Sequence, residues 1–467
     1  MDGRFAMWRN RHPVFHYNGF RVAQEPGLLR LRWDFAIDHL CEFHPETVVF
    51  TENLHILNDP NGVVARRIAF ALGLVEAISY WKCVCPPEVL VHCGAIAPED
   101  VAWWKRLWLG GLGEFFYRNG IETNEADFVC LRSDFSEAAA EQSAPFRSGA
   151  VRTLVPVGGG KDSCVTLELL RAAGTPLMGF AVNDQPARGA TFAAAGFAPK
   201  QMLRAKRTID PALLRLNTEG YWNGHTPFSA VVAFLGLYCA HLVGAENIVL
   251  SNEASADEAS VPGTEVNHQY SKSYAFEQDM NRYIGEYFGL PLCYFSLLRP
   301  FHELQIACRF AALPQFHAGF RSCNVGSKAN AWCGRCAKCL FVWLMLSPFL
   351  SQKELVRIFG SDLGAKPSLA EELRGLLGLR CTKPFECVGT VEEARAALTL
   401  TLLRFEQMGE SPPPLLQAAP PECRLTPERC AGLLRDFRAV HAVPQEFETA
   451  LERMKAFVGE IAGVAGA

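Results

Sequence analysis

The sequence has almost no excess of charge of either sign, and this absence bears on its possible partners. Its 45 Lys and Arg residues are opposed by 49 Asp and Glu residues, which leaves a formal net charge of −4 at pH 7. Proteins that bind nucleic acid or anionic lipid through their overall charge are usually strongly basic. We therefore expect no nucleic-acid partner and no general attraction to a membrane surface.

Long apolar runs are also missing. The longest, at residues 229–245, contains a histidine and is shorter than the roughly 20 residues that a membrane span needs, so we predict a buried helix there. The N-terminal residues MDGRFAMWRNRHP lack the apolar core and the small-residue cleavage site of a secretory signal. These features predict a cytoplasmic protein with no membrane span, whose 17 cysteines are reduced thiols.

The chain of 467 residues is longer than the roughly 250–300 residues that one hydrophobic core usually serves, so several domains are expected. Residues 1–145 contain runs such as GLLRLRWDFAI (27–37) and TVVFTENLHIL (47–57), in which apolar and polar residues alternate. This period of two favours strands. We predict a β-rich N-terminal domain, 1–145, that closes with a helix at residues 98–119.

The rest of the chain has a different pattern. Residues 146–350 twice follow the order strand, turn, helix, strand, which is typical of a parallel sheet with crossover helices. Residues 351–467 are rich in Leu, Ala and Glu and predict a mainly helical C-terminal region. The predicted fold class is therefore α/β.

The segment LVPVGGGKDSCVTLELLRAAG, at residues 154–174, runs from an apolar strand through three glycines into a helix. A helix N-terminus at the carboxyl edge of a parallel sheet presents backbone N–H groups to an anion, usually a phosphate. The segment fits neither GxxxxGK[ST] nor GxGxxG. We predict a phosphate-binding turn, called here the glycine turn, formed by Gly158, Gly159, Gly160, Lys161, Asp162 and Ser163.

Four cysteines lie close together in SCNVGSKANAWCGRCAKC, at residues 322–339, with the spacing C-x9-C-x2-C-x2-C. Four thiolates suit a tetrahedral zinc ion, and four also hold iron–sulfur clusters. The surrounding loop is polar, so apolar packing does not explain the thiols. We predict a metal site, with zinc favoured over an iron–sulfur cluster, formed by Cys323, Cys333, Cys336 and Cys339.

A polar segment, SNEASADEASVPGTEVNHQYSKSYAFE at residues 251–277, follows the predicted strand NIVLSN. Loops at this edge of a parallel sheet often bind substrate and carry catalytic groups. Lys272 can hold a carboxylate or a developing negative charge, and His268 can act as a general acid or base. We predict both as catalytic residues.

The glycine turn GGGKDS resembles SGGxDS, the pyrophosphate loop of the N-type ATP pyrophosphatases, or adenine nucleotide α-hydrolases. The resemblance implies a HUP-like parallel sheet, binding of ATP, and cleavage between its α and β phosphates. It implies that Asp162 helps to hold Mg²⁺, that Ser163 donates a hydroxyl, and that Asn183 and Asp184 lie near the nucleotide. The sequence departs from the family at Gly158, where the family has a serine, so one hydroxyl contact is missing.

The cysteine loop is similar to the zinc loop of the 7-cyano-7-deazaguanine synthases, which belong to the same superfamily. That resemblance implies a structural zinc ion, in agreement with a ligand set that leaves no position open for water.

Several motifs span nearly the whole chain: GLGEFFYRN, GGGKDS, SNEASADEAS, NHQYSKS, FRSCN with WCGRCAKC, and KPFECVGT. Together they resemble the MurL family, the ATP-dependent UDP-N-acetylmuramoyl-L-alanyl-L-glutamate epimerases. The resemblance implies that AMP is transferred to the α-carboxylate of the terminal L-glutamate and that pyrophosphate leaves. The α-hydrogen is then exchanged and hydrolysis leaves D-glutamate in a peptidoglycan precursor, downstream of a ligase that adds L-glutamate.

Adenylation makes chemical sense of this reaction, because removing the α-hydrogen beside a free carboxylate would build a second negative charge. The sequence does not rank the groups that might move the proton: His268, Cys164, Glu386 and Cys387. Arg321 is either a ligand of a substrate carboxylate or phosphate, or a surface residue.

Two other functions stay open at this point. One is a different pyrophosphatase of the same superfamily, acting on tRNA or on a small molecule as the deazaguanine synthases do. The other is a nucleotide-binding scaffold without catalysis, which the glycine at position 158 would suit.

Overall fold

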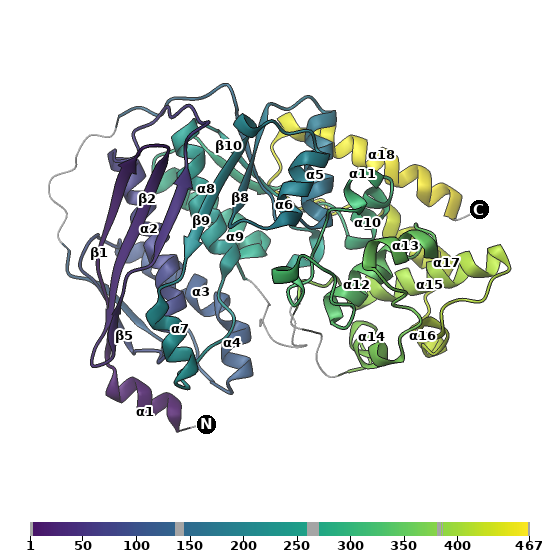
Figure 1. Ribbon diagram of the computed structural model, residues 1–467, viewed down its shortest axis with the longest axis horizontal. Helices are drawn as coiled ribbons and strands as arrows, with labels where there is room; N and C mark the ends of the chain where they lie inside the picture. The colour runs from purple at the N-terminus through teal and green to yellow at the C-terminus, as the bar shows by residue number, and fades with distance from the viewer. Residues whose placement is uncertain (1–2, 136–143, 259–269, 381–383, 385, 466–467) are drawn as a thin grey trace.

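The computed structural model describes residues 3–135, 144–258, 270–380, 384 and 386–465. In Figure 1 the strands of one twisted sheet lie in the left and central parts of the molecule, and the C-terminal helices lie on the right. The fold class is α/β, as predicted, with a helical C-terminal region.

Five parallel strands form one half of the sheet, in the order β11-β10-β7-β8-β9. This is the doubly wound order, in which the chain moves outward in one direction from β7 and later returns to the other side of it. The strands are β7 (Thr153–Pro156), β8 (Leu177–Val182), β9 (Met202–Thr208), β10 (Asn247–Leu250) and β11 (Cys293–Ser296).

Helices connect these strands on both faces of the sheet. The predicted buried helix is α8 (Phe228–Val243). Gly244 ends it with φ of +68°, the left-handed backbone conformation that glycine often adopts after the last turn of an α-helix. The other connecting helices are α5 (Lys161–Ala172), α6 (Pro186–Ala194), α7 (Pro211–Thr218) and α9 (Tyr274–Glu286).

The N-terminal strands extend the same sheet. β4 pairs antiparallel with β9, and the order continues β4-β2-β1-β5-β6, with β3 beside β2. The boundary predicted near residue 145 thus lies inside one continuous sheet, and the three-part division of the chain stays a prediction. The strands are β1 (Val14–Glu25), β2 (Leu28–Ile37), β3 (Cys41–Phe43), β4 (Glu46–Phe50), β5 (Glu88–Val91) and β6 (Cys130–Ser133).

The strand predicted at residues 27–37 is confirmed as β2, whose residues alternate between buried and half-buried as a period of two requires. The strand predicted at 47–57 is only partly right, because β4 ends at Phe50. The helix predicted at 98–119 is two helices, α3 (Pro98–Gly111) and α4 (Gly113–Arg118).

One long helix of this region was not predicted at all. α2 (Val63–Trp81) is buried along most of its length and packs on α8. A short helix, α1 (Arg4–Arg11), precedes β1. The N-terminal region therefore contains helices as well as the predicted strands.

Two hydrophobic cores meet at the sheet. One contains α2, α3, α8 and the buried residues of β1 and β2, and the other contains α5 and the C-terminal helices. These include α10 (Glu303–Ala311), α11 (Pro314–His317), α12 (Ala337–Leu346), α13 (Gln352–Phe359), α14 (Ala370–Leu376), α15 (Val391–Met408), α16 (Pro414–Gln417), α17 (Pro427–Arg435) and α18 (Glu448–Ala465). Within the described part of the chain, none of the helices combines the length and the apolar character of a bilayer span.

Candidate active site

The glycine turn lies at the switch point of the parallel sheet. β7 ends at Pro156 and α5 begins at Lys161, while β10 lies beside β7 and belongs to a later crossover. Gly160 caps α5 with extended backbone, and Gly159 has φ of +85°, a conformation that favours glycine. Ligands of doubly wound sheets bind at such a switch point, beyond the carboxyl ends of the strands.

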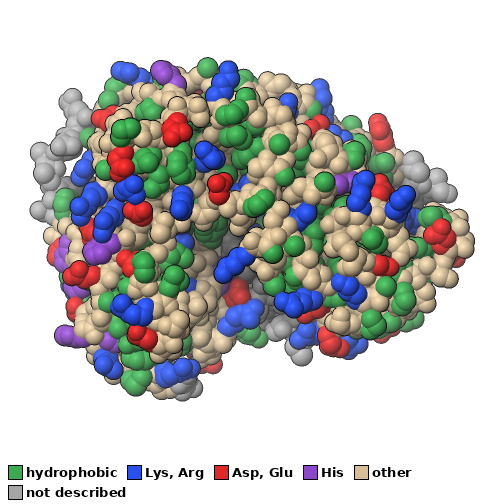
Figure 2. Space-filling model, in the orientation of Figure 1, with side chains coloured by type: hydrophobic (Ala, Val, Ile, Leu, Met, Phe, Trp, Pro, Cys, Tyr) green, Lys and Arg blue, Asp and Glu red, His purple; other side chains and the backbone are tan. Residues whose placement is uncertain are grey.

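A cavity of about 370 Å³ opens beside this turn. The segments that line it include the glycine turn, the end of β10, residues 271–272, the first turns of α8, and the cysteine loop with the residues before α15. Figure 2 shows a hollow near the middle of the molecule, with basic and acidic side chains beside it. The polar residues that line the cavity include Asp162, Ser163, Arg188, Ser251, Asn252, Glu253, Ser271, Lys272, Glu303, Arg321, Ser322, Asn324, Lys338, Glu386 and Cys387.

The structure brings together most of the residues predicted from the glycine turn and the polar loop. Gly158, Gly160, Asp162, Ser163 and Lys272 all line the cavity, although Lys272 is 109 positions or more from the turn in sequence. His268 lies outside the described residues.

Other predicted residues, among them Gly159, Asn183 and Asp184, do not line the cavity. Gly159 is buried behind the turn, where a Cβ atom would lie 3.1 Å from the Cβ of Ala187. The Oδ1 atom of Asn183 accepts a hydrogen bond from the backbone N–H of Arg207 at 2.8 Å, and Asn183 has φ of +64°. Asp184 is exposed.

Lys161 is almost completely buried, and its amine lies under the turn instead of facing the cavity. It donates hydrogen bonds to the carboxylates of Asp162 and Glu303. Burial favours the neutral amine, but the two carboxylates outweigh it and raise the pKa of Lys161. Lys161 therefore joins the turn to the start of α10 and keeps a positive charge inside the protein.

Asp162 is the acidic group of the turn that faces the cavity. Burial alone would raise the pKa of its carboxyl, but Lys161, Lys338 and Lys272 hold that pKa below its ordinary value. The carboxylate is thus ionised at neutral pH and has the hard oxygen donors that Mg²⁺ prefers. Ser163 donates its hydroxyl to the carbonyl of Gly160 at 3.0 Å, within the turn.

Lys272 reaches into the cavity and donates a hydrogen bond to the sulfur of Cys387 at 2.8 Å. Burial would lower the pKa of this amine, but its interactions with Cys387, Glu253 and Asp162 raise the pKa above its ordinary value. The cavity therefore contains an ammonium group at neutral pH beside the glycine turn.

Arg299, which the sequence did not single out, positions Lys272. Its guanidinium is fully buried and donates hydrogen bonds to the backbone carbonyls of Lys272, at 2.6 Å, and Glu253, at 2.8 Å. It also pairs with the carboxylate of Glu277 in α9. Removing one partner from such a buried ion pair usually lowers the stability of a protein by about 3–5 kcal/mol. Arg299, held by this pair, fixes the two cavity segments that contain Lys272 and Glu253.

Arg188 is a second cavity residue that was not predicted. It donates hydrogen bonds to the backbone carbonyls of Val182 and Asn183, the latter at 2.8 Å. Burial lowers its pKa. Its position in α6 follows the turn after β8, but a single arginine in a helix gives no signal of this contact.

The cysteine loop is docked on the glycine turn. The backbone N–H of Arg321 donates to the carbonyl of Gly159 at 2.8 Å, and the Oγ of Ser322 would lie 2.8 Å from a Cβ atom at Gly160. The guanidinium of Arg321 donates to the carbonyls of Ala318, Phe320 and Asn330 in its own loop while lining the cavity.

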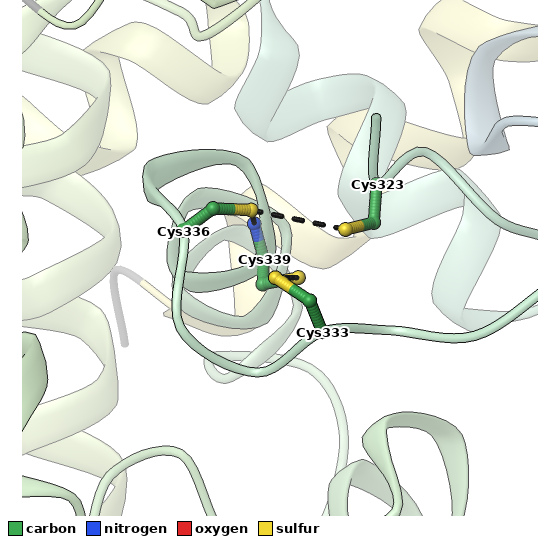
Figure 3. Close-up of side chains that lie close together, drawn as sticks. All are labelled: Cys323, Cys333, Cys336 and Cys339. Carbon is green, nitrogen blue, oxygen red and sulfur yellow. Dashed lines mark hydrogen bonds between the residues drawn. The ribbon is translucent and has the colours of Figure 1, made fainter. Parts of the chain in front are cut away.

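The four cysteines form one cluster, as predicted. The sulfurs of Cys323 and Cys336 lie 3.8 Å apart, those of Cys333 and Cys339 lie 3.7 Å apart, and all four sulfurs are within 4.8 Å of one another. Figure 3 shows the four side chains converging from the loop and the start of α12. Sulfurs at about 2.3 Å from a tetrahedral zinc ion would be separated by about 3.8 Å, so the geometry fits a metal such as zinc.

Backbone groups support the same assignment. The N–H of Gly326 donates to the sulfur of Cys323 at 3.2 Å, and the N–H of Cys339 donates to the sulfur of Cys336 at 3.5 Å. Such contacts orient thiolate ligands and partly neutralise their charge. Four cysteines would fill all four positions around such an ion, as in structural zinc sites.

Two protein-family models match this chain. Residues 7–297 match the family described as the MurL N-terminal domain, and residues 316–417 match the MurL C-terminal domain. No solved structure was found to match the chain.

Three curated relatives carry the name UDP-N-acetyl-alpha-D-muramoyl-L-alanyl-L-glutamate epimerase. The protein of Xanthomonas oryzae pv. oryzae is 37% identical over 77% of this chain and 80% of its own length. Those of Salinispora tropica and a Micromonospora species are each 36% identical, over 75% and 74% of this chain and 76% and 77% of their own lengths. Because the family match and these identities cover most of the sequence, the chain belongs to the MurL family.

Proposed function

We propose that this chain converts the terminal L-glutamate of UDP-N-acetylmuramoyl-L-alanyl-L-glutamate to D-glutamate, in an ATP- and Mg²⁺-dependent reaction of peptidoglycan precursor synthesis. The observation that carries the proposal is one cavity, at the switch point of the parallel sheet, that is lined by the glycine turn, Asp162 and Lys272. The names of the relatives support the choice of substrate.

The first step of the proposed reaction is transfer of AMP to the α-carboxylate of the glutamate, with release of pyrophosphate. The backbone N–H groups of the glycine turn and the N-terminus of α5 would stabilise the leaving pyrophosphate. Asp162 would hold Mg²⁺, which when bound neutralises charge on the phosphates. Lys272 would attract the substrate carboxylate before adenylation.

The second step is exchange of the α-hydrogen. In the acyl adenylate the carboxylate has lost its negative charge, so the electron pair left by the proton can be stabilised as an enolate. Return of a proton to the other face and hydrolysis of the adenylate would give D-glutamate and AMP. This order of steps explains why an epimerase needs a nucleotide-binding turn.

The proposal includes a structural zinc ion at the four cysteines and a cytoplasmic location, because the reaction consumes ATP. It includes a functional link to a ligase that adds L-glutamate and supplies the substrate. It includes no nucleic-acid partner, in keeping with the near-balanced charge of the sequence.

The direct test is one reaction in D2O with purified protein, ATP, Mg²⁺ and the UDP-linked L-glutamate substrate. We expect AMP and pyrophosphate, and after acid hydrolysis D-glutamate that contains one deuterium. Protein that binds ATP but forms neither AMP nor D-glutamate would contradict the proposal.

A matched pair of variants links this activity to the cavity. Asp162→Asn removes the carboxylate that faces the cavity, and we expect AMP formation to fall by at least about 100-fold, as for the loss of a group that stabilises transition-state charge. Asp127→Asn changes an exposed aspartate outside the cavity and should retain activity. Equal activity of the two variants would separate the reaction from this site.

A further inference from the structure

Epimerisation needs a group that removes the α-hydrogen, and the cavity singles out one. The residues that precede α15 bring Cys387 to the cavity wall, where its sulfur lies 2.8 Å from the amine of Lys272. The backbone carbonyl of Cys387 accepts a hydrogen bond from Lys338, whose amine also lies 5.4 Å from the ring centre of Phe341. Both the backbone and the thiol of this cysteine are therefore held in place by cations.

The pairing favours one chemical state of the thiol. An ammonium group within hydrogen-bonding distance stabilises a thiolate relative to a thiol, and the thiolate is the basic form of cysteine. Besides Cys387, the carboxylates of Glu253 and Asp162 raise the pKa of Lys272, so its positive charge does not depend on the thiolate alone. The lysine that favours the basic form of Cys387 thus lies beside the glycine turn.

The other candidates are less well placed. Cys164 is fully buried and does not line the cavity, and burial raises the pKa of its thiol to about 12. Glu386 lines the cavity, but its carboxylate accepts a hydrogen bond from Asn324 at 2.8 Å. Glu303 is fully buried and paired with Lys161. His268 lies outside the described residues.

We propose that the Cys387 thiolate, held by Lys272, removes the α-hydrogen of the adenylated glutamate. This inference rests on the proposed function. The S–H bond forms as the C–H bond breaks, and the electron pair moves into the enolate of the acyl adenylate. A proton from water, relayed through the cavity, returns to the opposite face, and the Cys387 thiol releases its proton to solvent. Lys272 acts here as a positioning residue for the base.

The experiment separates the two steps of the reaction. Wild-type protein and Cys387→Ala are compared for ATP–pyrophosphate exchange that depends on the L-glutamate substrate, and for deuterium incorporation at the α-carbon in D2O. We expect exchange of pyrophosphate in the variant to stay within about threefold of wild type, because the glycine turn is intact. We expect α-deuterium incorporation and D-glutamate to fall by at least about 100-fold.

The outcomes distinguish the two proposals. Failure of the wild type to exchange pyrophosphate or to form D-glutamate would contradict the proposed function itself. An active wild type with a Cys387→Ala variant that still incorporates deuterium would overturn the assignment of the base. Loss of both partial reactions in a folded variant would also overturn it, since the residue would then serve adenylation.

A second measurement reads the thiolate directly. Brief labelling with iodoacetamide at pH 7, followed by peptide mass spectrometry, should modify Cys387 faster than Cys293, an exposed thiol whose pKa is raised by partial burial and by nearby glutamates. Lys272→Met should slow the labelling of Cys387 by at least about tenfold and leave Cys293 unchanged. Equal labelling of Cys387 in the two proteins would contradict the pairing.

Discussion

At the scale of single residues, the glycine turn has room for a serine side chain at Gly158, the position at which the resembling pyrophosphatase loop has a serine. A Cβ atom at Gly158 would meet nothing within 4 Å, and Gly158 does not have positive φ. We predict that Gly158→Ser folds normally and lowers the KM for ATP in pyrophosphate exchange by about 2- to 10-fold. A new hydrogen bond to pyrophosphate is worth about 0.5–1.5 kcal/mol.

The neighbouring position provides the control. Gly159 has φ of +85°, and its Cβ would lie 3.1 Å from the Cβ of Ala187, so Gly159→Ser should weaken ATP binding and lower the unfolding midpoint. If both serine variants behaved alike, the space at position 158 would not explain the effect.

Residue types in the turn were predictable from the sequence, whereas the partners of those residues were not. The strand, glycines and following helix are local, so Asp162 and Ser163 could be placed in a turn between a strand and a helix before the fold was known. The inward orientation of Lys161 depends on Glu303, which is 142 positions away. Arg299 likewise has its role only because the fold brings the segments of Glu253 and Lys272 to it.

At the scale of single elements, α8 has a histidine at a position that disfavours its charged form. His241 is buried, and burial lowers its pKa to about 4; among the described residues, its Nδ1 atom has no hydrogen-bond partner. The folded protein therefore binds this proton less readily than the unfolded chain, whose histidines titrate near pH 6.5. The contribution to stability is complete above about pH 6.5 and is lost as the pH falls towards 4.

Chemical denaturation at pH 7 and at pH 4 tests this expectation. Between these values the wild type should lose about 3 kcal/mol more than His241→Gln, which cannot take up the proton. An equal loss in both proteins would show that acid destabilises the chain at other groups.

We expect the conformation of the cysteine loop to depend on a bound metal ion. We predict that purified protein contains about one zinc ion per chain and that Cys339→Ser loses it. Loss of a structural metal destabilises a protein by more than about 4 kcal/mol. The KM for ATP should rise too, because Arg321 links the loop to Gly159.

Metal analysis and thermal unfolding check this prediction, with Cys293→Ser, an exposed cysteine outside the cluster, as the control. Iron and acid-labile sulfide in place of zinc would contradict it and indicate an iron–sulfur cluster, which the spacing of the cysteines alone did not exclude.

Helices and strands were easiest to tell apart from the sequence where one face of the element is buried and the other is not. β2 alternates between buried and half-buried residues along its length, and a period of two is visible in its sequence. α2 is buried on nearly all sides, with 15 of its 19 residues in the interior, so it has no polar face to reveal a helical period. The pairing of β4 with β9 joins segments far apart in sequence, and no local pattern specifies it.

At the scale of the whole molecule, that pairing connects the N-terminal strands to the half of the sheet that carries the glycine turn. Five residue pairs link β4 to β9, from Glu46 with Thr208 to Phe50 with Arg204. α2 from the N-terminal region packs on α8 from the other half, and both contribute to one hydrophobic core. Unfolding either part would expose the apolar surface of the other, so we expect the strands on both sides of this pairing to unfold as one unit.

A substitution in β4 tests this coupling. Val49 is fully buried in that core, and Val49→Ala should cost about 2 kcal/mol through lost apolar contact and the cavity left behind. If the sheet opens as one unit, the slowest-exchanging amides of β7 and β8 should exchange with deuterium about 30-fold faster in this variant, by the same factor as those of β1 and β2. Faster exchange confined to β1–β6 would contradict the coupling and support an independent domain that ends near residue 145. The site would then depend less on the N-terminal strands than the continuous sheet indicates.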